Sequence, residues 1–267
     1  MKNKQKLIFK ILAGVIAVII IGGILFITNA FVGNPISAMM ANKAINQYVD
    51  KNYYFLDLET EKAIYNLKDG SYIVRAKYKT SIDTKFAIYY FDGKVQRDGY
   101  QDYVLGMFHT LDRLSGEYSA IAKSIIAKEL GYENNTTRVM YYKDEYEKPN
   151  DALELDMKFD KALPINAEVT IRLDLTNNSL EGISKVLTDV HKAFVVNDCI
   201  FSKYSLSSEN DGSLVEISGV TPANIESGEL LSLLKKAEMD EDTTIIGKGD
   251  EKKSIEGITV FRKGEKK

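Results

Sequence analysis

His109 and His191 are the only histidines in the 267-residue chain, and they are the first residues to weigh for metal binding or acid–base chemistry. Zinc and hydrolytic sites need several ligands, or a nucleophile, a base and an orienting group, that converge on one point. The chain has no His-Glu-x-x-His, Gly-x-Ser-x-Gly or Cys-x-x-Cys pattern. Each histidine follows an apolar position of a predicted helix, so we expect a boundary residue in both cases. The sequence therefore predicts no catalytic, metal-binding or cofactor-binding residue.

Two further groups of potentially reactive residues have simple structural interpretations. His109, Arg113 and Glu117 recur at spacings of four along one predicted helix, which favours a solvated, ion-paired ridge. Cys199 is the only cysteine, so it cannot form an internal disulfide. It stands at the start of a predicted strand, where a lone cysteine usually packs as a small apolar side chain. A reactive thiol is the alternative for Cys199.

The segment Ser81-Ile82-Asp83-Thr84 combines three polar side chains within four residues. This pattern is typical of a turn in which Asp and Thr side chains bond to nearby backbone groups. Contact of Ser81, Asp83 and Thr84 with a ligand is the alternative. The acidic segments 208–216 and 238–244 lack the ligand spacing of a calcium loop, so no calcium site is predicted.

Sixteen tyrosines raise the possibility of an aromatic surface. In a strand, the two rings of an adjacent pair point to opposite faces, so one ring must be partly exposed unless both faces are covered. Cross-strand packing is the ordinary explanation of tyrosines in sheets, and a surface that binds a polysaccharide or a peptide is the alternative. The adjacent pairs are Tyr53-Tyr54, Tyr89-Tyr90 and Tyr141-Tyr142.

The location of all these residues depends on the uncharged run from Ile11 to Thr28. At about 1.5 Å rise per residue, a helix of this length covers roughly 27 Å, close to the hydrocarbon thickness of a bilayer. Lysines precede the run and no charge follows it until Lys43, so the N-terminus is expected in the cytoplasm and the remaining chain outside the cell. We predict an uncleaved signal anchor within residues 1–33. A signal cleaved after Ala30 and a buried helix of a soluble protein are the alternatives.

Charge excludes one class of partner. The chain has 35 Lys and Arg against 38 Asp and Glu, and Lys2, Lys4, Lys6 and Lys10 precede the apolar run, so the exterior part is acidic. A nucleic-acid-binding domain concentrates Lys and Arg on one stripe, whereas both signs alternate here along almost every element. Nucleic acid is therefore not expected as a partner. The Lys-, Ile-, Asn- and Tyr-rich composition without tryptophan is typical of a low-GC Gram-positive bacterium.

A first exterior domain is predicted over residues 34–132. Asn34-Pro35 suits the cap and the first position of a helix, because Asn accepts backbone N–H bonds and Pro lacks an N–H that would be unpaired there. Asp69-Gly70 and Asp92-Gly93 each lie between alternating apolar runs, which predicts antiparallel hairpins. We therefore expect a helix that covers an antiparallel sheet.

The first domain is predicted to end with a long helix over residues 101–130, in which Ser115-Gly116 indicates a kink or a break. A second domain is expected over residues 133–267. Asn178 with Glu181 predicts the capped start of its main helix. The expected strands are 136–143, 152–160, 166–175, 200–206, 213–220, 243–249 and 257–264, and the expected helices are 179–196 and a short one after Ser227. Helices segregated against antiparallel sheets give both domains an α+β class.

Four segments occur in the order NPISAMMANKAINQYVDKNY, YNLKDGSYIVRAKY, SIDTKFAIYYFDGK and HTLDRLSGEY. In this order they resemble the YfjL-like family of Gram-positive membrane-anchored proteins. The resemblance covers about residues 34–118, and the second half is similar in layout. It implies a membrane location and this α+β architecture. Because the family has no established activity, the resemblance implies no catalytic residue and no cofactor.

Two functions of different class are compatible with these patterns. The first is a non-enzymatic, membrane-anchored extracytoplasmic protein that serves as a binding or interaction module of the cell envelope, with a protein, a peptide or a wall component as its partner. The second is an extracytoplasmic hydrolase with an unrecognised active site built from scattered carboxylates and histidines. The first is favoured, because no catalytic residue type lies in a recognisable catalytic turn. A deep cleft with converging titratable groups would favour the second.

Overall fold

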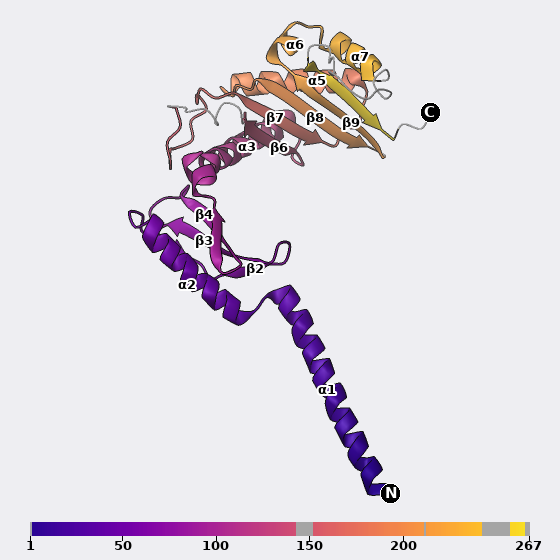
Figure 1. The fold of residues 1–267 in the computed structure, drawn as a ribbon. Helices are drawn as coiled ribbons and strands as arrows, with labels where there is room; N and C mark the ends of the chain where they lie inside the picture. The colour runs from indigo at the N-terminus through magenta and orange to yellow at the C-terminus, as the bar shows by residue number, and fades with distance from the viewer. Residues whose placement is uncertain (1, 143–151, 211, 242–256, 265–267) are drawn as a thin grey trace. The chain divides into compact units, whose positions relative to one another are not determined.

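The computed structural model of the chain describes residues 2–142, 152–210, 212–241 and 257–264. The chain divides into two compact units, Met1–Leu105 and Gly106–Lys267. Each unit has its own helices and its own sheet (Figure 1). The predicted α+β class is therefore confirmed, with an apolar N-terminal helix followed by two sheets in which antiparallel pairing dominates.

The first unit opens with two helices separated by a short break, α1 (Lys2–Val32) and α2 (Pro35–Asn52). The cap of α2 is the predicted one. Asn34 Oδ1 accepts hydrogen bonds from the backbone N–H groups of Ile36, at 2.8 Å, and Ser37, at 3.4 Å. These bonds satisfy donors that a helix start leaves unpaired, so α2 begins where the sequence requires it.

A five-stranded antiparallel sheet follows in the same unit. Its strands are β1 (Leu58–Thr60), β2 (Ile64–Asn66), β3 (Ser71–Tyr78), β4 (Lys85–Phe91) and β5 (Lys94–Asp98), and a π-helical segment, η1 (Tyr100–Leu105), ends the unit. Both predicted hairpins are confirmed, since β2 pairs with β3 across Asp69-Gly70 and β4 pairs with β5 across Asp92-Gly93. α2 contacts β3, β4 and β5, and its buried residues are Ala41, Ile45 and Val49.

The second unit is a five-stranded sheet covered by helices. Its elements are α3 (Phe108–Leu130), β6 (Thr136–Tyr141), β7 (Ala167–Leu173), α5 (Leu180–Val196), β8 (Lys203–Asn210), β9 (Ser213–Val220), α6 (Pro222–Glu226), α7 (Leu230–Glu241) and β10 (Thr259–Lys263). The strand order is β10-β9-β8-β7-β6. α5 lies beside both α3 and α7. On the sheet, α3 contacts β6, α5 contacts β8 and α7 contacts β10. One apolar core runs through all of these elements.

The boundary between the units corrects the expected domain division at residue 132. The structure divides between Leu105 and Gly106, so the predicted helix 101–130 is shared: η1 belongs to the first unit and α3 to the second. α3 belongs there because Tyr118 is 1% exposed among the second unit's core residues, and its hydroxyl accepts the backbone N–H of Ile200 at 2.9 Å. Periodicity showed a buried helix face but not which sheet buries it.

The interruption of this helical stretch also lies at another place than expected. α3 is continuous through Ser115-Gly116, so no break occurs at that pair. The interruption is at Met107, which has a φ of 58° in the left-handed region and precedes the first residue of α3. A non-glycine residue in this region is uncommon, and nothing in the local sequence signals it.

Two other expectations for the second unit are wrong, and one strand pair departs from the antiparallel pairing that dominates the sheet. Residues 152–160 form turns and no strand, because their alternating apolar side chains pack on the core as a loop. β7 and β8 pair in parallel, since α5 returns the chain between them. Ser179, not Asn178, caps α5, and its Oγ accepts the N–H of Gly182 at 3.1 Å. The predicted strand 243–249 lies outside the described residues.

Limited proteolysis is expected to cut between the units rather than at residues 133–137. Tyr103, Leu105 and Phe108 flank the boundary and are each more than 40% exposed. In contrast, Asn135 and Thr137 are buried, and β6 is paired with β7 from residue 136 onward. Chymotrypsin should therefore cleave within residues 103–108 before it cleaves within 133–137, because exposed segments are the preferred sites of nicking. Mass spectrometry of the early fragments checks this. Early cleavage within 133–137 would restore the boundary expected from the sequence.

One helix in the described part of the chain is long and apolar enough to cross a membrane, by its length and composition. It is the segment Phe9–Asn29 of α1, and no part of its most apolar stretch is buried against the rest of the structure. A signal sequence near the N-terminus has the same features. The segment is therefore a possible anchor, as the sequence indicates.

Candidate functional site

The predicted ligand contacts Ser81, Asp83 and Thr84 lie in the connection between β3 and β4, and they form a local turn. The backbone N–H of Thr84 donates to Ser81 Oγ at 2.9 Å, and the backbone oxygen of Thr84 accepts the N–H of Tyr78 at 2.8 Å. Asp83 and Thr84 are 1% and 4% exposed. The turn interpretation accounts for these contacts, and a ligand role for the three residues stays a hypothesis.

The two histidines occupy different environments. His109 is half-buried on α3, and its predicted neighbours form an ion pair, with Arg113 Nη1 2.8 Å from Glu117 Oε1. Arg113 also donates from Nη2 to the backbone oxygen of Met157 at 2.7 Å, so the predicted ridge is only partly solvated.

His191 is buried, which corrects the expectation of a boundary residue. Its Nδ1 lies 2.8 Å from the hydroxyl of Tyr204, and its Nε2 lies 3.1 Å from Glu226 Oε1. Tyr204 is 1% exposed, and burial raises the pKa of its hydroxyl far above the usual range. A buried imidazole with two hydrogen-bond partners is satisfied, and the raised pKa of Tyr204 keeps its hydroxyl protonated at neutral pH. We interpret this cluster as a polar brace between α5, β8 and α6.

Cys199 is 1% exposed, and its Sγ lies 3.5 Å from the backbone oxygen of Asn197. Burial raises the pKa of the thiol. A reactive cysteine needs a lowered pKa and solvent access. The packing interpretation of Cys199 is therefore confirmed.

Of the three adjacent tyrosine pairs, only Tyr89-Tyr90 lies wholly within a strand, and Tyr53-Tyr54 follows the end of α2. One member of each pair is buried, whereas Tyr54 is 81% exposed and Tyr89 and Tyr142 are half-buried. Cations cover the two half-buried rings: the Arg97 guanidinium lies 4.0 Å from the centre of the Tyr89 ring, and Lys203 Nζ lies 5.1 Å from that of Tyr142. These contacts explain the two half-buried rings as cation–π packing, and neither involves Tyr54. The buried members are Tyr53, Tyr90 and Tyr141.

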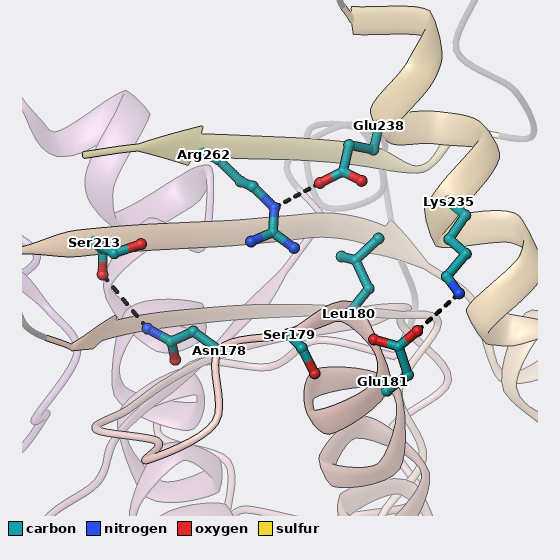
Figure 2. Close-up of a pocket in the computed structure, with 8 residues that line it drawn as sticks. All are labelled: Asn178, Ser179, Leu180, Glu181, Ser213, Lys235, Glu238 and Arg262. Atoms are coloured by element: carbon teal, nitrogen blue, oxygen red, sulfur yellow. Dashed lines mark hydrogen bonds and ion pairs between the residues drawn. The ribbon is translucent and has the colours of Figure 1, made fainter. Parts of the chain in front are cut away.

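The second unit has a cleft of about 500 Å³ over the start of α5, which Figure 2 shows. Its walls come from α5, α7, β9 and β10 together with the loop before α5. The residues that line it are Asn178, Ser179, Leu180, Glu181, Ser213, Lys235, Glu238 and Arg262. A volume of this size is within the range of sites for small ligands.

Charged groups of both signs alternate around the cleft. Lys235 Nζ lies 2.7 Å from Glu181 Oε1, and this pair joins α7 to the first turn of α5 (Figure 2). Arg262 Nε lies 2.5 Å from Glu238 Oε1, and this pair joins β10 to α7. The hydrogen bond from Lys235 lowers the pKa of Glu181, so its carboxylate is ionised at neutral pH. The cleft thus presents two cations and two anions, which come from α5, α7 and β10.

The base of the cleft is held by the loop that precedes α5. Asn178 Oδ1 accepts a hydrogen bond from Ser208 Oγ at 2.6 Å, and its Nδ2 donates to the backbone oxygen of Ser213 at 3.4 Å. Asn178 therefore ties the loop to β8 and β9, while Ser179 caps the helix. Because both side chains are engaged in structural hydrogen bonds, they position the cleft.

The chemistry available in this cleft is exchange of ion pairs. A ligand with an ammonium and a carboxylate group could replace the internal partners of Glu181 and Lys235 without leaving a charge unpaired. The lining contains no histidine or cysteine, and each of its two carboxylates, Glu181 and Glu238, is paired with a cation. In the residues that the structure describes, no three His, Cys, Asp or Glu side chains come together as possible metal ligands.

The cleft residues were not predicted as site residues. Glu181 was identified only as part of a cap, and Lys235, Glu238 and Arg262 belong to ordinary charged patterns on a helix and a strand. Their approach depends on the pairing of β10 with β9, which brings residues 259–263 beside 214–218. No local pattern in the sequence could have indicated it.

Comparison with known proteins identifies both halves of the chain. Residues 8–99 match the YfjL-like N-terminal domain, and residues 117–235 match the YfjL-like C-terminal domain. No curated protein and no solved structure matches the chain. The two matches follow the division into two units and together cover most of the sequence. The chain belongs to the YfjL-like family.

Proposed function

We propose that this protein is a membrane-anchored extracytoplasmic binding module of a Gram-positive cell envelope, without catalytic activity. The observation that carries the proposal is the segment Phe9–Asn29, an apolar helix whose side chains the rest of the structure leaves uncovered. A helix with an apolar surface on all sides needs lipid or protein around it. Lysines precede this segment, and no charged residue follows it until Lys43. This distribution favours a cytoplasmic N-terminus. Both folded units then lie outside the cell.

The binding part of the proposal rests on the cleft of the second unit. Its ion pair Lys235–Glu181 is exposed and can open toward a ligand, whereas Arg262–Glu238 is only partly accessible to solvent. Exposed pairs contribute only about 0–1 kcal/mol, so exchange of partners costs little. Ligands that match this alternation of charge carry both amino and carboxylate groups. The peptide stems of a Gram-positive wall belong to this class, and we propose the wall as the partner.

Co-sedimentation with purified Gram-positive sacculi tests this proposal. The full-length protein in detergent is expected to sediment with sacculi, and a Lys235→Glu/Arg262→Glu variant should bind roughly tenfold more weakly, because about 1–2 kcal/mol of charge complementarity is lost. Arg75→Glu/Lys77→Glu is the matched control, since these exposed cations are also ion-paired but lie in the other unit. Sedimentation of the control should equal that of the wild type.

The same assay separates binding from the hydrolase alternative. Release of soluble wall fragments by the wild type, but not by the cleft variant, would show an active site that the residues do not reveal. Failure of the wild type to sediment would contradict a wall partner. Equal loss in the cleft variant and in the control would mean that non-specific charge attraction holds the protein to the wall.

A further inference from the structure

α2 has apolar residues on two opposite faces, and only one of them is covered by protein. Ala41, Ile45 and Val49 are buried toward the sheet of the first unit. Ile36, Met39 and Met40 are 66%, 67% and 55% exposed. At about 100° per residue, these three residues lie on the side of the helix opposite the buried stripe. A contiguous group of large exposed apolar side chains marks a surface that contacts something else.

The composition of this outer face changes along the helix. After Met40 the same face continues with Lys43, Gln47 and Asp50, all of which are exposed. Lys43 is the first charged residue after Lys10. The face is therefore apolar for about one and a half turns and polar beyond them. Such a change of polarity along one face is expected where a helix leaves a lipid surface for water.

The apolar turns of α2 directly follow the proposed anchor. The N–H of Gly33 donates to the backbone oxygen of Asn29 at 3.0 Å, so the helical bonding of α1 extends to the junction. Asn34 is held to the sheet of the first unit, because its N–H donates to Tyr72 Oη at 2.7 Å and its backbone oxygen accepts from the same hydroxyl at 3.0 Å. Met40 lies six residues further on, at most about 9 Å along the helix. The headgroup region is about 5–7 Å thick on each side of a bilayer, so these turns begin within it.

We propose that Ile36, Met39 and Met40 insert into the outer lipid–water interface, with Lys43 at the level of the lipid phosphates. This inference rests on the proposed anchor and adds a second contact with the membrane. The chain has no charge from Ile11 to Asn42, as a segment in and beside lipid requires. A lysine at the edge of such a face extends its ammonium group toward anionic headgroups. The first unit is then held against the membrane through its own helix, in addition to being tethered by α1.

Site-specific fluorescence quenching tests this arrangement in the full-length protein. Single cysteines replace Ile20, Met40 or Gln47 in a Cys199→Ala background, and each carries an environment-sensitive fluorophore in vesicles of mixed neutral and anionic lipid. Met40 and Gln47 are a matched pair, because both are exposed and lie on the same face two turns apart. A headgroup quencher should reduce emission about twofold at position 40, since interfacial helices bury their apolar face by about 5–10 Å, and should leave position 47 unchanged. A quencher deep in the acyl chains should act at position 20.

Each outcome of this experiment supports or overturns a distinct claim. Quenching at positions 20 and 40 but not at 47 supports the proposal. Quenching at position 20 alone overturns it and leaves the anchor intact. Absence of quenching at all three positions contradicts the anchor and the interfacial helix together. Equal quenching at positions 40 and 47 also overturns it, because depth would then not follow the change from apolar to polar residues.

Discussion

A cysteine placed at Asn134 is expected to react with a membrane-impermeant maleimide in intact bacteria, whereas a cysteine placed at Asn3 should react only after the membrane is opened. Asn134 is exposed in the loop between α3 and β6, so its labelling depends on location and not on unfolding. Asn3 precedes the apolar segment. The contrast should be nearly all-or-none, because translocating even one charged residue through the bilayer centre costs about 2.5–3.5 kcal/mol and four lysines precede the segment.

Both cysteines are introduced in a Cys199→Ala background, so that the buried native thiol cannot contribute to labelling. The same background without an added cysteine is the control and should not be labelled. Labelling of both positions in intact cells would contradict a cytoplasmic N-terminus. A mature protein that begins near Phe31 would show that the segment is a cleaved signal. Labelling of neither position until lysis would place both units in the cytoplasm and contradict the proposed function. The protein should also stay in the membrane fraction after washing at alkaline pH, as an integral protein does.

Local signals in the sequence were sufficient to predict individual elements. Asn34-Pro35 set the start of α2, because the cap and the proline act within four residues of the helix start. Asp92-Gly93 set the β4–β5 turn, because both residues adopt positive φ there. The helix expected over residues 179–196 is also confirmed, since α5 covers Leu180–Val196. In each case the information lies within one element or one turn.

Features that depend on contacts between helices and strands distant in the sequence could not be predicted from such local signals. The helix expected over residues 101–130 was assigned to the first domain, but α3 packs on the second unit's sheet, because a helix face carries no record of its partner. The spacing of apolar residues in α5 does not distinguish the position before Val190 from the position after it. His191 is nevertheless buried, and its ring contacts Glu226 of α6. The cleft needs β10 beside β9, a pairing between residues more than forty positions apart. Tertiary contacts of this kind require the fold itself.

Substitution of Gly219 is expected to destabilise the second unit strongly. Its φ is +78°, and it lies in β9 opposite the shift in register between Tyr204 and Leu206 of β8. This is the arrangement of a β-bulge, in which glycine takes the left-handed conformation. A Cβ atom at Gly219 would lie 2.0 Å from the backbone oxygen of Gly257, at the start of the β10 segment. The three nearest atoms are all backbone atoms of Gly257 and Ile258, so no flexible side chain can move out of the way.

Gly219→Ala should therefore destabilise the second unit by about 3 kcal/mol or more. Roughly 1–2 kcal/mol comes from the left-handed backbone of a residue with a Cβ, and about 1–3 kcal/mol comes from displacement of β10 by overpacking. Gly228→Ala is the matched control, because Gly228 has a φ of +77° and nothing lies within 4 Å of its would-be Cβ. The control should lose only the backbone contribution of about 1–2 kcal/mol. The difference between the two variants measures the close approach of β9 to Gly257.

The buried thiol of Cys199 gives a readout that belongs to the second unit alone. It is the only cysteine of the chain and is 1% exposed, so a thiol reagent reaches it when that unit opens. When opening and closing are fast, the labelling rate follows the population of the open form. Because each 1.4 kcal/mol is a factor of ten, Gly219→Ala should label about a hundredfold faster than the wild type, and Gly228→Ala about tenfold faster. Equal rates for the two variants would mean that Gly257 does not approach β9 in solution. In that case the cleft, whose Arg262 depends on the same pairing of β10 with β9, would lack its β10 wall.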